Sequence, residues 1–379
     1  MTGGPVETGS LLETTLLTLG SPSTLSGGYL YHQRVASLAP NCGARFRFVS
    51  FPDLPFPLPV AASRRVLAEV LDQRPDVVLV DSIAAAYATF LRSRIARRAP
   101  IAVMMHQPPG GMEHGWCTTA ATRMLDRLLL ARADHVFAAS ESLGEPLARS
   151  GVAAGAVTVV PPGCDTSSGG SDTSEAAGPS WAHLRRGRRA AVACVANWIP
   201  RKGIMELLDA FAMLPDDQAF LHLAGDADVE PAYGAAVRNR LAEPDLRERA
   251  EMHGRLSPAQ VAALYAGVDF FALASVQEPY GTVYGEAMAA GLPVVGWRAG
   301  NLPNLASDGV EGLMAEPGEV KALSAAMSRL ARDEVLRAEM GTAALRRADQ
   351  FPTWQDTTCA LVDGMRRLVA QRERSTLTG

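Results

Sequence analysis

The sequence lacks the cysteine and apolar patterns that mark disulfide-stapled or membrane-spanning proteins. Its five cysteines are scattered, and no two have the Cys-x-x-Cys spacing of a redox or zinc motif. An odd, dispersed set argues against a disulfide framework or a structural zinc site. No apolar run reaches about 18 residues, and no basic start precedes a long apolar run. We therefore expect a cytoplasmic protein.

The chain also lacks a large charge imbalance. Its formal net charge of -4 gives no overall attraction to nucleic acid or to acidic lipid, so we expect no nucleic-acid partner. Basic stretches at 92–98 and 185–189 are typical both of solvated helix faces and of membrane-surface patches. Membrane contact is expected to be peripheral at most.

What the sequence does contain is enough apolar residues for two cores. A chain of 379 residues with 47% hydrophobic residues exceeds the usual size of a single core. Short apolar segments alternate with helical patterns, and several are apolar at consecutive positions, as in strands covered on both faces. The expected strands are 14–19, 77–80, 101–105, 135–138 and 158–160, then 191–195, 220–224, 269–273 and 293–296. Repeated strand–helix units predict an α/β fold with parallel sheets.

A segment without periodicity separates the two series of strands. Residues 161–180 are rich in Gly, Ser, Pro and Asp, which is typical of a connection between domains. We predict an N-terminal Rossmann-like domain over 1–165, a linker over 166–185 and a C-terminal Rossmann-like domain over 186–352. A last helix over 353–379 is expected to cross back onto the N-terminal domain, with capping of the C-terminal domain as the alternative.

The strongest motif is EPYGTVYGEAMAAGLPVV at 278–295. It follows an expected strand, turns at a glycine and opens a helix, so Glu278 lies in the loop and Glu286 in the first helical turns. Free N–H groups at the helix start, around residues 281–283, favour an anion such as a diphosphate. Two glutamates eight residues apart would alone be compatible with an ordinary strand–turn–helix whose second acid is solvated.

The whole segment resembles the signature of retaining glycosyltransferases, above all family 4, the group 1 glycosyl transferases. That resemblance implies a GT-B fold, in which two Rossmann-like domains face each other across a cleft and close over a nucleotide diphosphate sugar. It implies that Glu278 contacts the donor sugar and that Glu286 holds the nucleotide ribose. The surrounding donor-binding residues would be Tyr280, Gly281, Thr282 and Val283.

A second motif, NWIPRKGIMELLDAF at 197–211, follows another expected strand. By itself a pair of cations at a turn is compatible with solvated surface residues. The stretch resembles the family element in which an arginine and a lysine neutralise the donor diphosphate, and Lys202 with Gly203 matches its Lys-Gly pair. Ala196-Asn197 replaces the usual Gly-Arg, so Arg201 is assigned to the second cation.

The N-terminal half contributes a weaker set of candidates. Gly27 and Gly28 follow the first strand and resemble the family's glycine loop, which lies near the donor phosphate and the acceptor. His106 follows the strand 101–105 and resembles the histidine that contacts the donor sugar, although a lone histidine is often structural. Asp81, at the end of the strand 77–80, is a candidate on the acceptor side.

Metal ions are not expected to take part. The Asp-x-Asp at 226–228 follows a strand that resembles the family's Gly-Asp-Gly element, which places Gly225 on the nucleotide side instead of at a metal site. The resemblance implies that fixed cations and a helix N-terminus stabilise the leaving diphosphate, with Lys202, Glu278 and His106 as the catalytic group. In the implied front-face reaction the departing phosphate takes the acceptor proton.

These observations predict a retaining, metal-independent glycosyltransferase that needs a nucleotide diphosphate sugar as co-substrate and no other cofactor. Its acceptor would be a small molecule, a saccharide or a natural product, since the Ala, Arg and Gly content suggests a GC-rich bacterial genome and a biosynthetic role. The alternatives are a nucleotide-sugar epimerase or hydrolase of the same fold, and a non-catalytic sugar-nucleotide binding protein.

Overall fold

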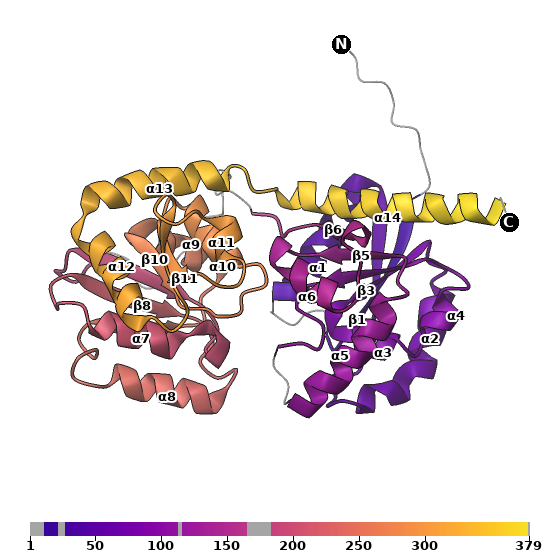
Figure 1. Ribbon diagram of the computed structural model, residues 1–379, viewed down its shortest axis with the longest axis horizontal. Coiled ribbons are helices and arrows are strands. Elements are labelled where there is room, and N and C mark those ends of the chain that lie inside the picture. The colour runs from indigo at the N-terminus through magenta and orange to yellow at the C-terminus, as the bar shows by residue number, and fades with distance from the viewer. Residues whose placement is uncertain (1–10, 22–26, 113–115, 165–182, 378–379) are drawn as a thin grey trace, which may run out of the picture. The chain divides into compact units, whose positions relative to one another are not determined.

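The computed structural model describes residues 11–21, 27–112, 116–164 and 183–377. Most of the expected linker, 166–185, lies outside the described residues. The chain divides into two compact units: residues 1–163 together with 352–379, and residues 164–351 (Figure 1). Each contains a six-stranded, fully parallel sheet, which confirms the predicted α/β class with two Rossmann-like parts.

The sheet of the first unit has the strand order β2-β1-β3-β4-β5-β6. Its strands are β1 Leu12–Leu19, β2 Ala44–Phe51, β3 Val77–Asp81, β4 Ile101–Met105, β5 His135–Ala138 and β6 Val157–Val159. Its helices are α1 Gly27–Leu38, α2 Ser63–Asp72, α3 Ala85–Ala88, α4 Arg92–Ile95, α5 Trp116–Leu130, α6 Gly144–Arg149 and α14 Trp354–Leu377. β3 and β4 are buried along their whole length, as their unbroken apolar runs predicted.

The final helix α14, yellow in Figure 1, packs against the first unit beside α1. Leu361, Val362 and Met365 are fully buried in that unit's core. Gly364 lies so close to β5 that a Cβ atom there would be 2.6 Å from the Phe137 ring, which explains a glycine inside a helix. Burial of this apolar face holds the last helix on the first unit.

One covalent link was not expected from the sequence. Cys42 and Cys359 form a disulfide that joins the 3₁₀ turn Ala39–Cys42 to α14, across 317 residues of sequence. Spacing rules find cysteines that are neighbours in the chain, whereas this pair meets only because α14 packs back on the first unit. The Arg366 guanidinium adds a hydrogen bond to the Cys42 carbonyl at 2.8 Å.

The sheet of the second unit has the order β12-β11-β10-β7-β8-β9. Its strands are β7 Ala190–Val195, β8 Ala219–Ala224, β9 Ala250–Gly254, β10 Phe270–Leu273, β11 Val294–Trp297 and β12 Gly312–Ala315. Its helices are α7 Ile204–Ala212, α8 Pro231–Leu241, α9 Pro258–Gly267, α10 Thr282–Ala289, α11 Leu302–Leu305, α12 Val320–Arg332 and α13 Glu334–Ala348. In parallel sheets of this kind ligands bind at the carboxyl ends of the strands, and Lys202, Gly225 and Glu278 follow β7, β8 and β10.

Candidate functional site

In the first unit, the candidate residues lie at the carboxyl edge of the sheet. Asp81 is the last residue of β3 and pairs in register with Met104 of β4, and His106 follows β4 directly. Gly28 lies in the first turn of α1, where an added Cβ atom would be 3.6 Å from the His106 ring. The sheet edge and α1 therefore bring Gly28, Asp81 and His106 together. Gly27 begins the same helix.

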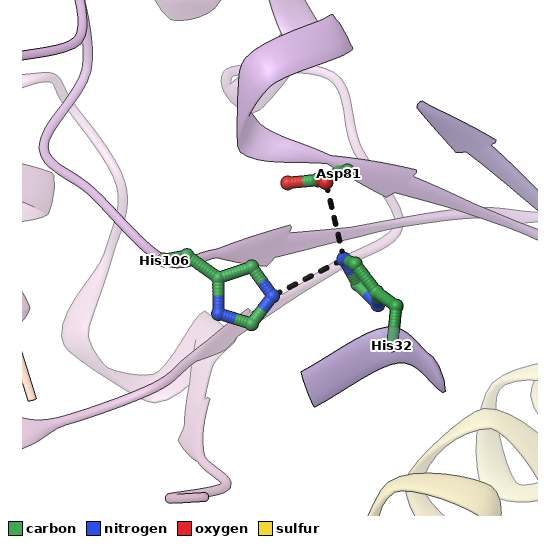
Figure 2. A group of neighbouring side chains, drawn as sticks. All are labelled: His32, Asp81 and His106. Atoms are coloured by element: carbon green, nitrogen blue, oxygen red, sulfur yellow. Dashed lines mark hydrogen bonds and ion pairs between the residues drawn. The ribbon is translucent and has the colours of Figure 1, made fainter. Parts of the chain in front are cut away.

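A third side chain, not found from the sequence, joins Asp81 and His106 (Figure 2). His32 projects from α1, and its Nε2 lies 3.2 Å from Asp81 Oδ2 and 3.1 Å from His106 Nε2. Its Nδ1 is buried without a hydrogen-bond partner among the described residues, so we assign the ring hydrogen to Nε2. The Thr18 hydroxyl donates to the same Asp81 oxygen at 3.1 Å. Asp81 thereby orients His32, which in turn orients His106.

The surroundings lower the pKa at both ends of this group, which keeps Asp81 charged and His106 neutral. Burial alone would raise the pKa of Asp81, but the adjacent His32 and His106 lower it to about 2. Burial and the neighbouring His32 lower the pKa of His106 to about 3, against the pull of Asp81. At neutral pH Asp81 is therefore charged and His106 is neutral, and a neutral imidazole can exchange hydrogen bonds with a sugar hydroxyl.

The loop that carries His106 is held by α5. The backbone N–H of Gly110 donates to Asp126 Oδ2 at 2.7 Å, and the Thr122 hydroxyl donates to the Gly110 carbonyl at 3.2 Å. Gly110 adopts a φ of +97°, which side chains rarely allow. Burial raises the pKa of Asp126 to about 7, although the Gly110 hydrogen bond opposes that rise.

In the second unit, the candidate cation and acid meet across neighbouring strands. β7 and β10 are hydrogen-bonded neighbours, and the loops that follow them carry Lys202 and Glu278. Lys202 Nζ forms an ion pair with Glu278 Oε2, and both side chains are 12% exposed. Gly203 ends the turn with a φ of +65°, and a Cβ atom there would lie 1.8 Å from the Ala274 carbonyl oxygen. Only glycine lets the Lys202 turn pack this closely on β10.

Backbone hydrogen bonds hold the Glu278 loop in place. The Arg201 guanidinium donates to the Gln277 carbonyl at 3.0 Å, while the Asn301 N–H donates to the Glu278 carbonyl at 2.9 Å. Gly300 packs against the Glu278 backbone, where an added Cβ atom would be 2.8 Å from its nitrogen. Arg201 thus lies beside the Lys202–Glu278 pair, and its side chain contacts the loop that carries Glu278.

The acid motif continues into α10 as the sequence predicted. Gly281 precedes the helix with a φ of +85°, and Thr282 and Val283 form its first turn. Burial raises the pKa of Tyr280, whose carbonyl accepts a hydrogen bond from the Asn301 side chain at 2.9 Å. The first amides of a helix have no acceptor within it, so this turn offers N–H donors near the Lys202–Glu278 pair.

Glu286 lies farther along α10. Its side chain is exposed. The surrounding protein atoms would raise the pKa of its carboxyl to about 7, but water reaches the group and counteracts that shift. A carboxylate at this position can accept hydrogen bonds from two hydroxyl groups.

A hollow of about 490 Å³ opens in the second unit beside the end of β8. It is lined by Trp198, Gly225, Asp226, Ala227, Asp228, Arg238, Met252, Gly254 and Arg255. Gly225 has a φ of +146°, and a Cβ atom there would be 1.8 Å from the Ala196 carbonyl oxygen. Both acids of the Asp-x-Asp face arginines, with Asp226 3.1 Å from Arg255 and Asp228 3.4 Å from Arg238.

Two groups among the described residues have the composition and spacing to hold a metal ion. One is the Asp81, His32 and His106 group, and the other consists of His222, Glu251 and His253 in the second unit. In the first group one atom, His32 Nε2, lies within hydrogen-bond distance of both Asp81 Oδ2 and His106 Nε2. Among the same residues, no helix is both long enough and apolar enough to span a bilayer.

Comparison with known proteins gives a family for each unit. The family model described as "Glycosyl transferase 4-like domain" matches residues 12–163, and the model "Glycosyl transferases group 1" matches residues 180–347. The D-inositol 3-phosphate glycosyltransferase of Corynebacterium glutamicum is 30% identical over 45% of this chain, and the chain spans only 41% of that protein. A GDP-mannose-dependent phosphatidylinositol monomannoside α-(1-6)-mannosyltransferase of Mycolicibacterium smegmatis is 29% identical, over 88% of this chain and 86% of that protein.

Solved structures show the same fold at lower identity. Anabaena HepE, in complex with UDP and glucose, has a TM-score of 0.75 and 21% identity over 93% of this chain and 99% of its own. The sucrose-phosphate synthase of Thermosynechococcus elongatus has a TM-score of 0.79 and 19% identity over 95% and 99%. These neighbours support the GT-B fold that the motifs predicted.

Proposed function

Because the chain belongs to the group 1 glycosyl transferases, as its motifs predicted, we propose that it transfers a sugar from a nucleotide diphosphate sugar to an acceptor hydroxyl. The observation that carries this proposal is the Lys202–Glu278 ion pair, set beside the first turn of α10 in the second unit. A cation and helix amides suit the leaving diphosphate, whose negative charge grows as the glycosidic bond breaks. The glutamate suits the hydroxyl groups of the sugar.

We assign the donor to the second unit. Lys202, supported by Arg201, would neutralise the diphosphate, Glu278 would hold the sugar, and Glu286 would bind the ribose. The hollow at Gly225 would take the nucleotide side, which is supported by its lining of arginines and the buried Trp198. Because these cations are fixed in the chain, the transfer is proposed to need no metal.

We assign the acceptor side to the first unit. His106, neutral and oriented by His32 and Asp81, would hydrogen-bond the sugar being transferred, with Gly27 and Gly28 near the donor phosphate. The reaction is proposed to retain the anomeric configuration. The bond from the anomeric carbon to the phosphate oxygen breaks, the acceptor oxygen bonds to the same face, and its proton passes to the departing phosphate oxygen.

The named relatives define the substrates to try first. The C. glutamicum relative is named for D-inositol 3-phosphate, and the mycobacterial relative is named for GDP-mannose and a phosphatidylinositol mannoside. Because Anabaena HepE was solved with UDP and glucose and the mycobacterial relative is named for GDP-mannose, we propose a UDP- or GDP-linked sugar as donor. The proposed acceptor is a polyol, free or on a lipid headgroup.

The test is nucleotide diphosphate release by the purified full chain, measured with UDP- and GDP-sugars, with and without inositol phosphates or phosphatidylinositol mannosides. Release is expected only when donor and acceptor are both present, to persist in EDTA, and to be lost in Lys202→Ala. The product's anomeric proton coupling should match that of the donor. Release without any acceptor would indicate a hydrolase, and donor binding without turnover on any acceptor would favour the non-catalytic binder.

A further inference from the structure

The second unit contains a cluster of metal-ligating side chains that the glycosyl transfer does not use. His222 lies on β8, while Glu251 and His253 lie on the neighbouring edge strand β9. One ligand atom from each residue lies within 4.8 Å of the other two. We propose that these three side chains form a binding site for a divalent transition metal ion, with Zn²⁺ as the best match.

The strand pairing explains why the three side chains converge. His222 is directly opposite Glu251 in the parallel register of β8 and β9. The ligand atoms of Glu251 and His253 both lie within 4.8 Å of that of His222, so the two side chains of β9 reach the same side of the sheet edge. A register shift after Leu223 leaves His253 as an extra residue on β9, because Met252 pairs with Leu223 and Gly254 with Ala224.

Hydrogen bonding selects the ligand atom of the central histidine. His222 is fully buried, and its Nε2 lies 2.9 Å from the Leu184 carbonyl oxygen, so Nε2 carries the hydrogen. Its Nδ1 then has a lone pair directed at His253 Nε2, 3.0 Å away. A metal-ligating histidine usually donates its second ring N–H to a carbonyl or carboxylate in this way. The Leu184 contact therefore already provides the outer shell of a metal site.

The distances suit a tetrahedral ion. Two imidazole nitrogens bound to one tetrahedral Zn²⁺ at 2.0–2.1 Å are separated by about 3.3 Å. The 3.0 Å separation of the two ring nitrogens needs only a small widening to admit the ion. The His253 hydrogen would then reside on its Nδ1, which leaves Nε2 as the ligand.

Two histidines and one carboxylate form a donor set that zinc accepts, with a fourth position left for water. Arg186 donates to Glu251 Oε2 at 2.8 Å, which occupies one of the two carboxylate oxygens. Its guanidinium and that of Arg188 also lie over the Phe220 ring, 5.8 and 5.3 Å from the ring centroid. The positive charge of the metal would repel these arginines. The side chain of Arg186 is 54% exposed, so it can turn toward solvent when the metal binds.

The proposed site is separate from the hollow at Gly225. Met252, between Glu251 and His253, projects from the opposite face of β9 and lines that hollow. The metal ion would thus lie on the face of β9 that points away from the hollow. It would link the edge strand β9 to β8. Its expected effect is on the stability of this sheet edge.

The experiment uses the full chain without an affinity tag, stripped with a chelator and titrated with Zn²⁺ alone. Bound metal is counted by mass spectrometry, and affinity is measured against a chromogenic chelator. We expect His253→Ala to bind one Zn²⁺ fewer per chain, or to bind it at least about 100-fold more weakly. Zn²⁺ should also raise the melting temperature of the wild type more than that of the variant.

Matched variants distinguish binding at this site from binding at the chain's remaining histidines. His183→Ala, an exposed histidine of the same unit, should bind Zn²⁺ like the wild type, and so should His106→Asn in the first unit. Glu251→Gln should weaken binding and provides a second variant should His253→Ala not fold. Absence of Zn²⁺ binding by the wild type, or a loss in His106→Asn or His183→Ala but not in His253→Ala, would overturn the proposal.

Discussion

The buried carboxyl of Asp126 offers a perturbation whose magnitude follows from the structure. Asp126 is 4% exposed, its Oδ2 accepts the Gly110 N–H at 2.7 Å, and its Oδ1 has no partner among the described residues. Asp126→Asn retains an oxygen acceptor for Gly110 and removes the ionisable group. The substitution therefore isolates what a titrating carboxyl at this position does to stability.

The sign follows from proton linkage. Burial raises the pKa of Asp126 from its ordinary value of 3.8 to about 7 in the folded protein. Between these two pH values the folded state holds a proton that the unfolded state has lost, so unfolding is favoured as pH rises. A shift of about 3 pKa units corresponds to about 4 kcal/mol of stability, fully present below pH 3.8 and lost by about pH 7. His106 acts in the opposite direction, because its pKa is lowered to about 3 and its contribution is lost as pH falls below 6.5.

The assay compares wild type with Asp126→Asn, so that His106 and all other groups cancel. Urea unfolding of the first unit is followed from pH 4 to 8 by hydrogen exchange in β4 and α5. The stability of the wild type relative to the variant should fall by about 4 kcal/mol as pH rises from 4 to 8. If the difference in unfolding stability between the two proteins does not change over this pH range, the assignment of Asp126 as a buried carboxyl that retains its proton is refuted.

Three further substitutions test other parts of the structure. Gly203→Ala should destabilise the second unit by more than about 2 kcal/mol in urea unfolding, because its φ of +65° and the Ala274 carbonyl leave no room for a Cβ atom. Cys42→Ser should lower the stability of the first unit by about 2–4 kcal/mol without reductant, and reduced wild type should match it. His106→Ala should lower kcat by about 100-fold while the affinity for free nucleotide diphosphate stays unchanged, and equal losses in both would contradict its proposed role.

The buried strands were predictable because their residues are apolar at consecutive positions. β3 and β4 were found almost to the residue. Three strands were missed, namely β2, β9 and β12, and each lies at the edge of a sheet or is short. In β2, Arg45 and Arg47 alternate with apolar residues. Edge strands often carry such charges, so a search for consecutive apolar residues does not find them.

In the candidate site, too, features formed by neighbouring residues were predictable from the sequence, whereas contacts between distant residues were not. The loop at Glu278 and the turn at Lys202 are each formed by contiguous residues, so the sequence predicted both turns and the start of α10. Their ion pair depends on β7 lying beside β10, which no short motif encodes. His32 was missed because its partners Asp81 and His106 are reached only through the fold. The sequence signal that could have identified His32 is a histidine on the helix that begins at the Gly-Gly pair.

The most direct test of the proposed donor site is a calorimetric titration of nucleoside diphosphate, with the matching nucleoside as control, into wild type and Lys202→Ala. If Lys202 neutralises the diphosphate, the variant should bind the diphosphate about 100-fold more weakly, corresponding to about 2.7 kcal/mol. Its affinity for the nucleoside without phosphates should stay unchanged. Equal diphosphate affinity in both proteins would contradict a donor site at Lys202 and the transfer mechanism built on it.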